Sequence, residues 1–342
     1  MKILFIGGSG VISRAVTEQT LAAGHELWLL NRGQHRPVAG ARTLVADMAD
    51  LASARAALHG HTWDVVVQWI AFGPDDIRRD LELFRDTARQ YIFISSASVY
   101  QKPPASPYLI TESTPRVNPH WEYSRKKIAA ELALETAHQA TGFPFTIVRP
   151  SLTYGDDQIP LVLNAWPQPW TAIDRMRRGA PLIIPGDGTA LWTITHNTDF
   201  AAGLIGLFGQ PAAIGEALHI TSDEVLTWNR IFALTAEAAG VTAPKFVHMT
   251  SDFIISCVPA VEGTLLGDKA VSAVFDNSKL KRLVPGFAAK TTFAAGIRRT
   301  LAWFEADPAR QQIDAELNRR WDKLITCYDR ATAQAKAEFT NT

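Results

Sequence analysis

The chain of 342 residues is long for a single compact core, which favours one large domain joined to a smaller one. Apolar residues make up 47% and charged residues 20%, a globular balance that excludes a disordered or fibrous chain. Lys and Arg together number 34, as do Asp and Glu, so the net charge of zero provides no general field to attract nucleic acid or an anionic membrane.

Cysteine spacing, histidine spacing and the apolar runs narrow the class of protein further. Cys257 and Cys327 are too few and too far apart for a disulfide framework or a cysteine-based zinc site, and the nine histidines show no metal spacing. The apolar runs are too short to span a bilayer, and the first one is too short for a signal peptide. We therefore expect a cytoplasmic protein that binds neither metal nor membrane.

The first half of the chain alternates short apolar runs with helical patterns. Apolar strands separated by helices indicate a parallel sheet covered on both faces, because parallel neighbours need a crossover connection. The sequence therefore predicts a doubly wound α/β fold, a Rossmann dinucleotide-binding domain, over residues 1–150. The expected strands are 2–6, 26–30, 43–46, 64–69, 91–95 and 145–148, the expected helices 11–23, 51–58, 75–89 and 121–140, with a Pro- and Ser-rich loop at 101–119.

After Pro150 the rhythm changes, and the strand and helix runs become less regularly spaced. We interpret residues 151–342 as mainly a smaller substrate-binding lobe, with some segments returning to the main domain. The expected strands are 182–184, 191–195, 218–221 and 245–248, and the expected helices are 198–208, 228–239, 292–304 and 309–337.

A glycine-rich turn lies between the first expected strand and the first expected helix. The chain must turn sharply there while its backbone approaches a pyrophosphate, and a side chain at Gly7 or Gly10 would block one or the other. The helix start offers free N–H groups and a positive dipole end. The pattern predicts a dinucleotide loop, with a plain tight turn as the alternative. Its candidate cofactor contacts are Gly7, Ser9, Gly10, Val11 and Ile12.

Two positions depart from the usual dinucleotide pattern. The usual third glycine is Ser13, whose hydroxymethyl group should be tolerated with the helix slightly displaced. An acid that would hold the ribose hydroxyls of NAD is replaced by Asn31 and Arg32, and an amide with a guanidinium suits a 2′-phosphate better. We therefore favour NADP over NAD, the alternative being that Arg32 is a solvated loop cation. Asp47 is placed to accept from the adenine amine, or to act as a helix cap or turn residue.

A tyrosine and a lysine four residues apart share one face of an expected helix. A free tyrosine has a pKa near 10, and a nearby ammonium stabilises the phenolate and lowers that value. Tyr123 beside Lys127 is therefore a candidate acid/base for an alcohol or ketone, although the spacing also occurs in surface pairs. Ser96 and Ser98 follow the fifth strand, at the sheet edge that borders the ligand crevice, where a hydroxyl could hold the reacting oxygen.

Together these residues resemble the extended short-chain dehydrogenase/reductases, the group that contains the sugar-nucleotide epimerases and dehydratases. The resemblance runs from Met1 to about Phe304 and implies Tyr123 as acid/base, Lys127 as its partner and Ser96 as the hydroxyl that orients the substrate oxygen. It is also compatible with a homodimer. The matching segments are residues 7–10, 95–100, 123–127, 148–150 with 154–155, 185–188 and 196–199.

Further contacts complete the expected site. The resemblance implies that the segment after Pro150 lines the nicotinamide and that the second half supplies substrate contacts. Four tryptophans could line an apolar or sugar-stacking pocket, with ordinary packing as the alternative: Trp121, Trp166, Trp170 and Trp192. The additional cofactor candidates are Met48, Ala71 and Pro150, and the substrate candidates are Ser98, Trp121, Tyr154 and Trp192.

One departure from the family bears on the substrate. Many sugar-nucleotide members carry an arginine shortly before the histidine that matches His196, where it meets the diphosphate, whereas residues 189–195 hold no cation. This weakens the case for a nucleotide-diphosphate substrate. The chain also resembles an epimerase-like branch related to a plant chloroplast RNA-binding group, at residues 221–224, 227–229 and 275–279.

Three functions are consistent with these observations. The first is an NAD(P)-dependent oxidoreductase that transfers hydride at a secondary alcohol or ketone carbon of a sugar-like or other small substrate. The second is a sugar or sugar-nucleotide epimerase or dehydratase that retains NAD. The third is a non-catalytic nucleotide-sensing or RNA-binding protein on the same fold, against which the intact Ser96, Tyr123 and Lys127 set and the zero net charge both argue.

Overall fold

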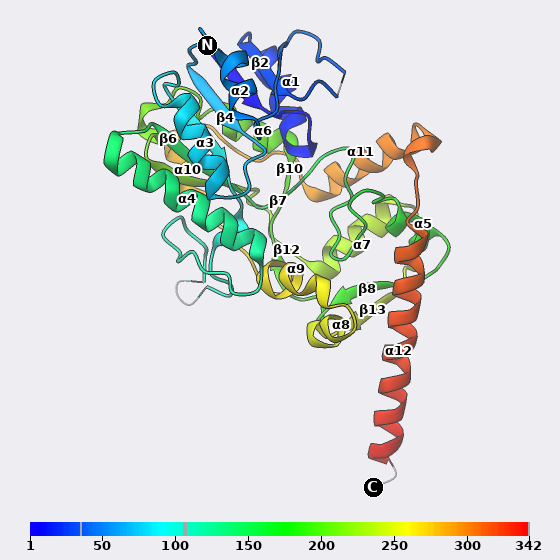
Figure 1. The fold of residues 1–342 in the computed structure, drawn as a ribbon. Coiled ribbons are helices and arrows are strands. Elements are labelled where there is room, and N and C mark those ends of the chain that lie inside the picture. The colour runs from blue at the N-terminus through cyan, green and yellow to red at the C-terminus, as the bar shows by residue number, and fades with distance from the viewer. Residues whose placement is uncertain (35, 105–107, 341–342) are drawn as a thin grey trace. The chain divides into compact units, whose positions relative to one another are not determined.

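The computed structural model describes residues 1–34, 36–104 and 108–340, so part of the expected loop at 101–119 lies outside the described residues. The chain divides into two units, and their elements are labelled in Figure 1. Unit 1 comprises Met1–Thr153, Thr195–Asp223 and Phe275–Lys290, and unit 2 comprises Tyr154–Ile194, Glu224–Val274 and Thr291–Thr342.

Unit 1 is built on a seven-stranded parallel sheet with the strand order β11-β6-β5-β4-β1-β2-β3. Central strands such as VVVQ and YIFI are buried along their whole length, as expected of a sheet covered on both faces. The predicted doubly wound α/β fold is confirmed. The strands are β1 (Lys2–Ile6), β2 (Glu26–Asn31), β3 (Arg42–Val45), β4 (Val65–Gln68), β5 (Tyr91–Ile94), β6 (Phe145–Pro150) and β11 (Glu216–Ile220).

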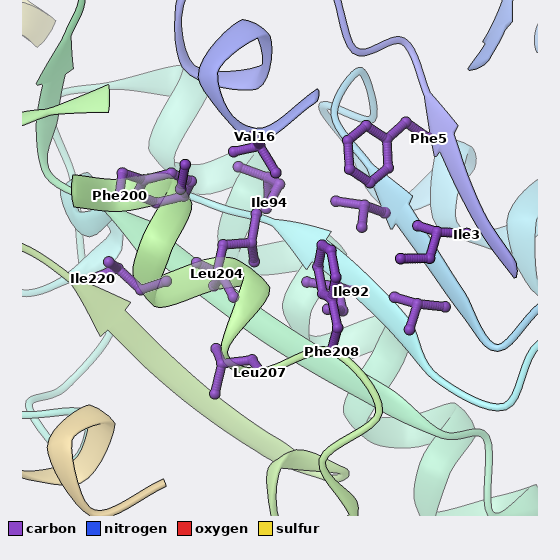
Figure 2. Close-up of a cluster of buried hydrophobic side chains, with 14 of the residues drawn as sticks. Ile3, Phe5, Val16, Ile92, Ile94, Phe200, Leu204, Leu207, Phe208 and Ile220 are labelled. Atoms are coloured by element: carbon purple, nitrogen blue, oxygen red, sulfur yellow. The ribbon is translucent and has the colours of Figure 1, made fainter. Parts of the chain in front are cut away.

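One face of this sheet is covered by α1 (Val11–Ala22), α6 (Asn197–Ile205) and the short α10 (Ser278–Leu283). Figure 2 shows Val16 of α1 and Phe200 and Leu204 of α6 packed against side chains of β1, β5 and β11. The segments that contribute α6 and β11 come from the second half of the sequence, so that half helps to build the main sheet.

The opposite face is covered by α2 (Leu51–Leu58), α3 (Pro74–Phe84) and α4 (Glu122–Thr141). Helix α3 is shorter than the expected 75–89 and begins at a proline, which suits a first helical position. The carboxylate of Asp76 accepts from the backbone N–H groups of Phe72 and Gly73, which caps the helix start. The strand order reverses between β1 and β4, and ligands of such sheets bind at that point, beside the carboxyl ends of the strands.

Unit 2 contains the parallel pair β8 and β13 and the antiparallel pair β9 and β12. The last helix starts later than expected because residues 308–310 form a separate short turn and Asp314 accepts from the backbone N–H of Leu317. Its strands are β8 (Leu182–Pro185), β9 (Leu191–Trp192), β12 (Leu226–Thr227) and β13 (Phe246–Met249), and its helices are α5 (Thr171–Arg177), α7 (Trp228–Ala238), α8 (Ser251–Cys257), α9 (Glu262–Thr264), α11 (Phe293–Glu305) and α12 (Ala315–Thr340). The remaining strands, β7 (Leu152–Tyr154) and β10 (Ile194–His196), pair with each other, and most of their residues belong to unit 1.

Among the residues that the structure describes, no helix has both the length and the apolar character needed to cross a bilayer.

Candidate active site

The glycine turn after β1 depends on two left-handed residues. Gly7 has φ +95° and Gly8 has φ +103°, a region in which residues with a Cβ are strained. A Cβ on Gly7 would also lie 2.9 Å from the side chain of Ile70. A Cβ on Gly10 would instead make an ordinary contact with Ser13, so the neighbouring protein atoms do not require glycine there. Gly10 is thus compatible with a space reserved for a ligand.

Ser13 holds the loop rather than simply being tolerated in the helix. Its Oγ accepts from the backbone N–H of Gly10 at 2.8 Å and donates to the carbonyl of Gly10 at 3.3 Å. The Thr17 hydroxyl donates to the carbonyl of Gly8 at 2.9 Å, and Asn197 of α6 donates to the carbonyl of Val11 at 2.8 Å. The loop is therefore fixed from two helices, with the start of α1 facing the same turn.

A cavity of about 360 Å³ lies against this loop in unit 1. Its walls come from the glycine turn, the ends of β2, β3 and β4, and one side of α3, which is where an adenine nucleotide binds in such folds. Gly10, Val11, Ile12 and Pro150 lie outside its lining. The predicted cofactor contacts that line it are Gly7, Ser9, Asn31, Arg32, Asp47, Met48 and Ala71.

The polar side chains around the cavity already have some partners in the protein. Asn31 accepts from the backbone N–H of Gly33 at 2.8 Å, and Asp47 accepts from that of Ala49 at 2.9 Å, so both also shape turns. Arg32 supplies a guanidinium to the same cavity. The glycine cradle, the helix start and these polar groups are a donor set that fits a nicotinamide dinucleotide. No group of His, Cys, Asp and Glu suited to a metal ion occurs among the described residues.

Lys127 is buried on α4 and is held between the ends of two strands. Its Nζ donates to the carbonyl of Ala71 at 2.7 Å, just after β4, and to the carbonyl of Ile94 at 2.8 Å, at the end of β5. Burial lowers the pKa of Lys127 to about 7, while the charges of Glu131 and Asp76 act to raise it. Since Ala71 lines the cavity, the lysine is tied to the cavity wall.

Tyr123 lies one helical turn before Lys127, whose Nζ is 5.8 Å from the centre of the tyrosine ring. The ring also neighbours Trp121, with ring centres 5.0 Å apart, and Phe72, with ring centres 6.3 Å apart. The structure therefore brings the predicted phenol and ammonium to one face of α4, next to the loop that follows β4.

Ser96 connects to this helix through a chain of hydroxyls. Its Oγ lies 2.9 Å from that of Ser98, and the hydroxyl of Ser124, the residue after Tyr123, donates to Ser98 at 2.7 Å. Asn118 also donates to the carbonyl of Ser98 at 2.8 Å. Ser98 is buried, so its hydroxyl joins the end of β5 to α4, whereas Ser96 is half-buried.

The two substrate candidates of unit 2 are buried within that unit. Tyr154 packs beside Phe293, with ring centres 5.7 Å apart. Trp192 stacks on Trp228, with ring centres 5.5 Å apart. Both side chains contribute to the packing of unit 2.

The sequence analysis did not single out three further polar residues beside the cavity. Asp80 of α3 is buried, and its Oδ2 accepts from the amide of Gln68 at 2.6 Å and from the hydroxyl of Tyr91. Burial raises the pKa of Asp80 to about 7, against the effect of these two hydrogen bonds. Gln68 and Asp80 both line the cavity. The available signal was that Gln68 ends an otherwise apolar strand, where ligand crevices form.

Comparisons with known proteins show which family and which folds the chain is similar to. The family described as "NAD dependent epimerase/dehydratase family" matches residues 3–220. The chain is 26% identical over 263 residues to the chloroplast stem-loop binding protein of 41 kDa b of Arabidopsis thaliana, covering 72% of this chain and 65% of the relative. It is 24% identical over 247 residues to the 2'-dehydrokanamycin reductase of Streptomyces kanamyceticus, covering 70% of this chain and 67% of that one.

Among solved structures, the fold is similar to UDP-glucuronic acid 4-epimerase from Bacillus cereus in complex with NAD. The TM-score is 0.70 at 18% identity, with 90% of this chain and 99% of that chain covered. At this identity the likeness concerns the fold. The matches to the two curated relatives span about two thirds of their lengths.

Proposed function

Since the chain belongs to the NAD dependent epimerase/dehydratase family, we propose that it transfers hydride between a nicotinamide dinucleotide and a secondary alcohol or ketone carbon of a sugar-like or other small substrate. The family and the class of enzyme expected from the sequence, a nicotinamide-dependent oxidoreductase or epimerase, are confirmed. The observation that carries the proposed reaction is Lys127, which lies one turn from Tyr123 and is bonded to a carbonyl of the cavity wall.

In this proposal each side chain has a defined task. The nicotinamide, when bound, accepts or supplies the hydride. The phenol of Tyr123 takes a proton from the substrate hydroxyl or returns it to the carbonyl oxygen, and the ammonium of Lys127 stabilises the phenolate. The Ser96 hydroxyl orients the same oxygen. The glycine turn from Gly7 and the start of α1 bind the pyrophosphate.

For the cofactor, we propose NADP. The support is Arg32, a guanidinium that lines the cavity at the end of β2, where Asn31 replaces the usual acid. NAD is the alternative, and the solved B. cereus epimerase contains it.

A reductase is the first candidate, and an epimerase or dehydratase that retains NAD is the second. The reductase is supported by the similarity to 2'-dehydrokanamycin reductase and by the lack of a cation in residues 189–195. The epimerase is supported by the family and by the shared fold. The third function considered from the sequence, RNA binding, has the similarity to a stem-loop binding protein in its favour, but the family match favours an enzyme. We also propose that the protein is cytoplasmic and that it forms a homodimer. Sizing of the purified protein would test the homodimer.

A single set of measurements separates these functions. Purified protein is examined for bound nicotinamide absorbance and then incubated with NADPH and a panel of ketones that includes 2'-dehydrokanamycin and ketosugars. The reductase proposal predicts an exchangeable cofactor and NADPH consumption with at least one ketone. Tightly bound nicotinamide with no net consumption would favour the epimerase. If the protein binds no cofactor and consumes no NADPH with any ketone, both enzyme proposals are contradicted.

A further inference from the structure

We propose that Asp80 is a positioning residue for Lys127. Through the side chain of Gln68, it fixes the backbone that offers the Ala71 carbonyl to the lysine. This inference rests on the proposed function, because the lysine's task is defined there. Asp80 itself touches neither the lysine nor the hydroxyl of Tyr123 in the contacts described above; it acts through the loop after β4.

The first support is the unusual setting of the Asp80 carboxyl. Asp80 is 2% exposed, and the close partners of its carboxyl are the neutral groups of Gln68 and Tyr91. The charged groups that face it, Asp76 and Arg79 of the same helix, form an ion pair with each other. Burying a carboxyl without a cationic partner costs free energy, and an apolar side chain would fill the same space more cheaply. Its presence therefore calls for a task beyond packing.

The second support is that a carboxylate sets the orientation of the Gln68 amide. Oδ2 of Asp80 accepts from the amide nitrogen of Gln68 at 2.6 Å, so the NH₂ end of Gln68 faces Asp80. This leaves Oε1 of Gln68 to accept from the backbone N–H of Ile70 at 2.8 Å. Asp80 thereby determines which end of the amide meets the loop.

The third support is the position of Ala71 between two anchored residues. The N–H of Ile70, on one side, is bonded to Gln68, and the N–H of Phe72, on the other side, donates to Asp76 at 2.8 Å. The carbonyl of Ala71 between them accepts from Lys127 at 2.7 Å. Asp76 therefore holds one flank of this carbonyl directly, and Asp80 holds the other flank through Gln68. Release of one flank would let that carbonyl, and the ammonium with it, move.

The test compares Asp80→Asn, Asp80→Leu and a matched control, Asp75→Leu, whose side chain is 78% exposed on the same helix. Asp80→Asn retains an oxygen that accepts from both donors, whereas Asp80→Leu removes the acceptor. The first readout is the titration of Lys127 in cofactor-free protein, followed by NMR of labelled lysine side chains. The second is kcat and KM for a ketone that the wild type is found to reduce in the panel.

We expect Asp80→Leu to shift the Lys127 titration and to lower kcat about tenfold to a hundredfold, because small misplacements of a catalytic group have effects of this size. The KM of the ketone should change less than about threefold, and Asp80→Asn should recover most of the kcat. Asp75→Leu should match the wild type in both readouts. A folded Asp80→Leu variant with an unchanged Lys127 titration and a kcat within about twofold of the wild type overturns the inference, even if its melting temperature falls.

Two arrangements keep the result interpretable. If Asp80→Leu does not fold, Gln68→Met has a similar shape, lacks the amide and is expected to give the same changes. If the wild type reduces no ketone, the proposed function fails, but the Lys127 titration still decides whether Asp80 positions the lysine.

Discussion

Two buried carboxylates on adjacent helices of unit 1, Asp80 of α3 and Glu131 of α4, have contrasting surroundings. Glu131 accepts two hydrogen bonds from Arg149, at 2.6 and 2.9 Å, and further bonds from Arg116 and Ser95. These cations and the serine hold the pKa of Glu131 below its usual value despite burial. Asp80 has neutral donors, and burial raises its pKa to about 7.

Glu131 belongs to a structural ion pair, whereas Asp80 is a carboxyl at the proposed site whose pKa is raised by burial. Glu131 joins α4 to Arg149 on β6 and stays ionised across the neutral range. Asp80 borders the cavity and changes its charge near neutral pH, which is common where burial is maintained for function. Glu131 also affects the proposed site, because its charge acts to raise the pKa of Lys127, one helical turn away, against the effect of burial.

The largest expected effect is the loss of stability when the ion pair of Glu131 is removed. Glu131→Gln leaves the Arg149 guanidinium buried without its counter-charge, and we expect the free energy of unfolding to fall by about 3–5 kcal/mol. Denaturant unfolding near pH 7 measures the change. Glu135→Gln removes a half-buried partner of Arg116 and should cost less than about 1 kcal/mol. Equal losses in the two variants would contradict the structural role assigned to Glu131.

The next largest expected effect is the pH dependence of the stability that Asp80 contributes. Since the pKa of Asp80 rises from 3.8 to about 7 on folding, its proton stabilises the fold below pH 3.8, and this contribution is lost as pH rises through 7. Asp80→Asn does not titrate, so its stability relative to the wild type should increase over this range, by up to about 4 kcal/mol. Lys127 titrates in both proteins and cancels in the difference.

Urea unfolding of both proteins at several pH values between 4 and 8 measures that difference. Glu131 has a lowered pKa and predicts the opposite slope: the stability it contributes is present above the ordinary glutamate pKa of 4.5 and is lost as pH falls below it. If the difference in the free energy of unfolding between Asp80→Asn and the wild type is constant over the whole pH range, Asp80 does not differ from Glu131 in the way described.

The smallest expected effect is a change in cofactor affinity at the cavity. Arg32→Ala removes the guanidinium proposed to meet the 2′-phosphate, so we expect NADPH to bind about tenfold more weakly and NADH to change less than about twofold. Fluorescence titration of each cofactor measures this, with Arg36→Ala, an exposed arginine nearby, as the control. Equal weakening of both cofactors would argue against a phosphate contact.

Local pattern was enough to predict much of the fold. The apolar runs of β4 and β5 are buried throughout, and their boundaries match the expected segments to within about two residues, because a strand covered on both faces leaves a continuous apolar run. The position of the glycine turn after β1 was predictable for a similar reason, since its conformation excludes most other residues there.

The contacts of the site were less accessible from the sequence. Gln68, Asp80 and Tyr91 come from three elements, and in the sequence Asp80 is one of many charges on a helix with a wet face. Only the packing of α3 on the sheet makes it a buried group. For Trp192 the sequence left packing and pocket lining open, and its stacking on Trp228 depends on contacts that no local pattern records.

The most direct test of the central claim is the kinetics of Tyr123→Phe with the ketone substrate. The ring remains, so the aromatic contacts with Trp121 and Phe72 are retained while the proton donor is lost. We predict that turnover falls about 10²–10⁴-fold, the usual contribution of a general acid, while the dissociation constant of the cofactor stays within about twofold. Near-normal turnover in this variant would contradict the proposed mechanism.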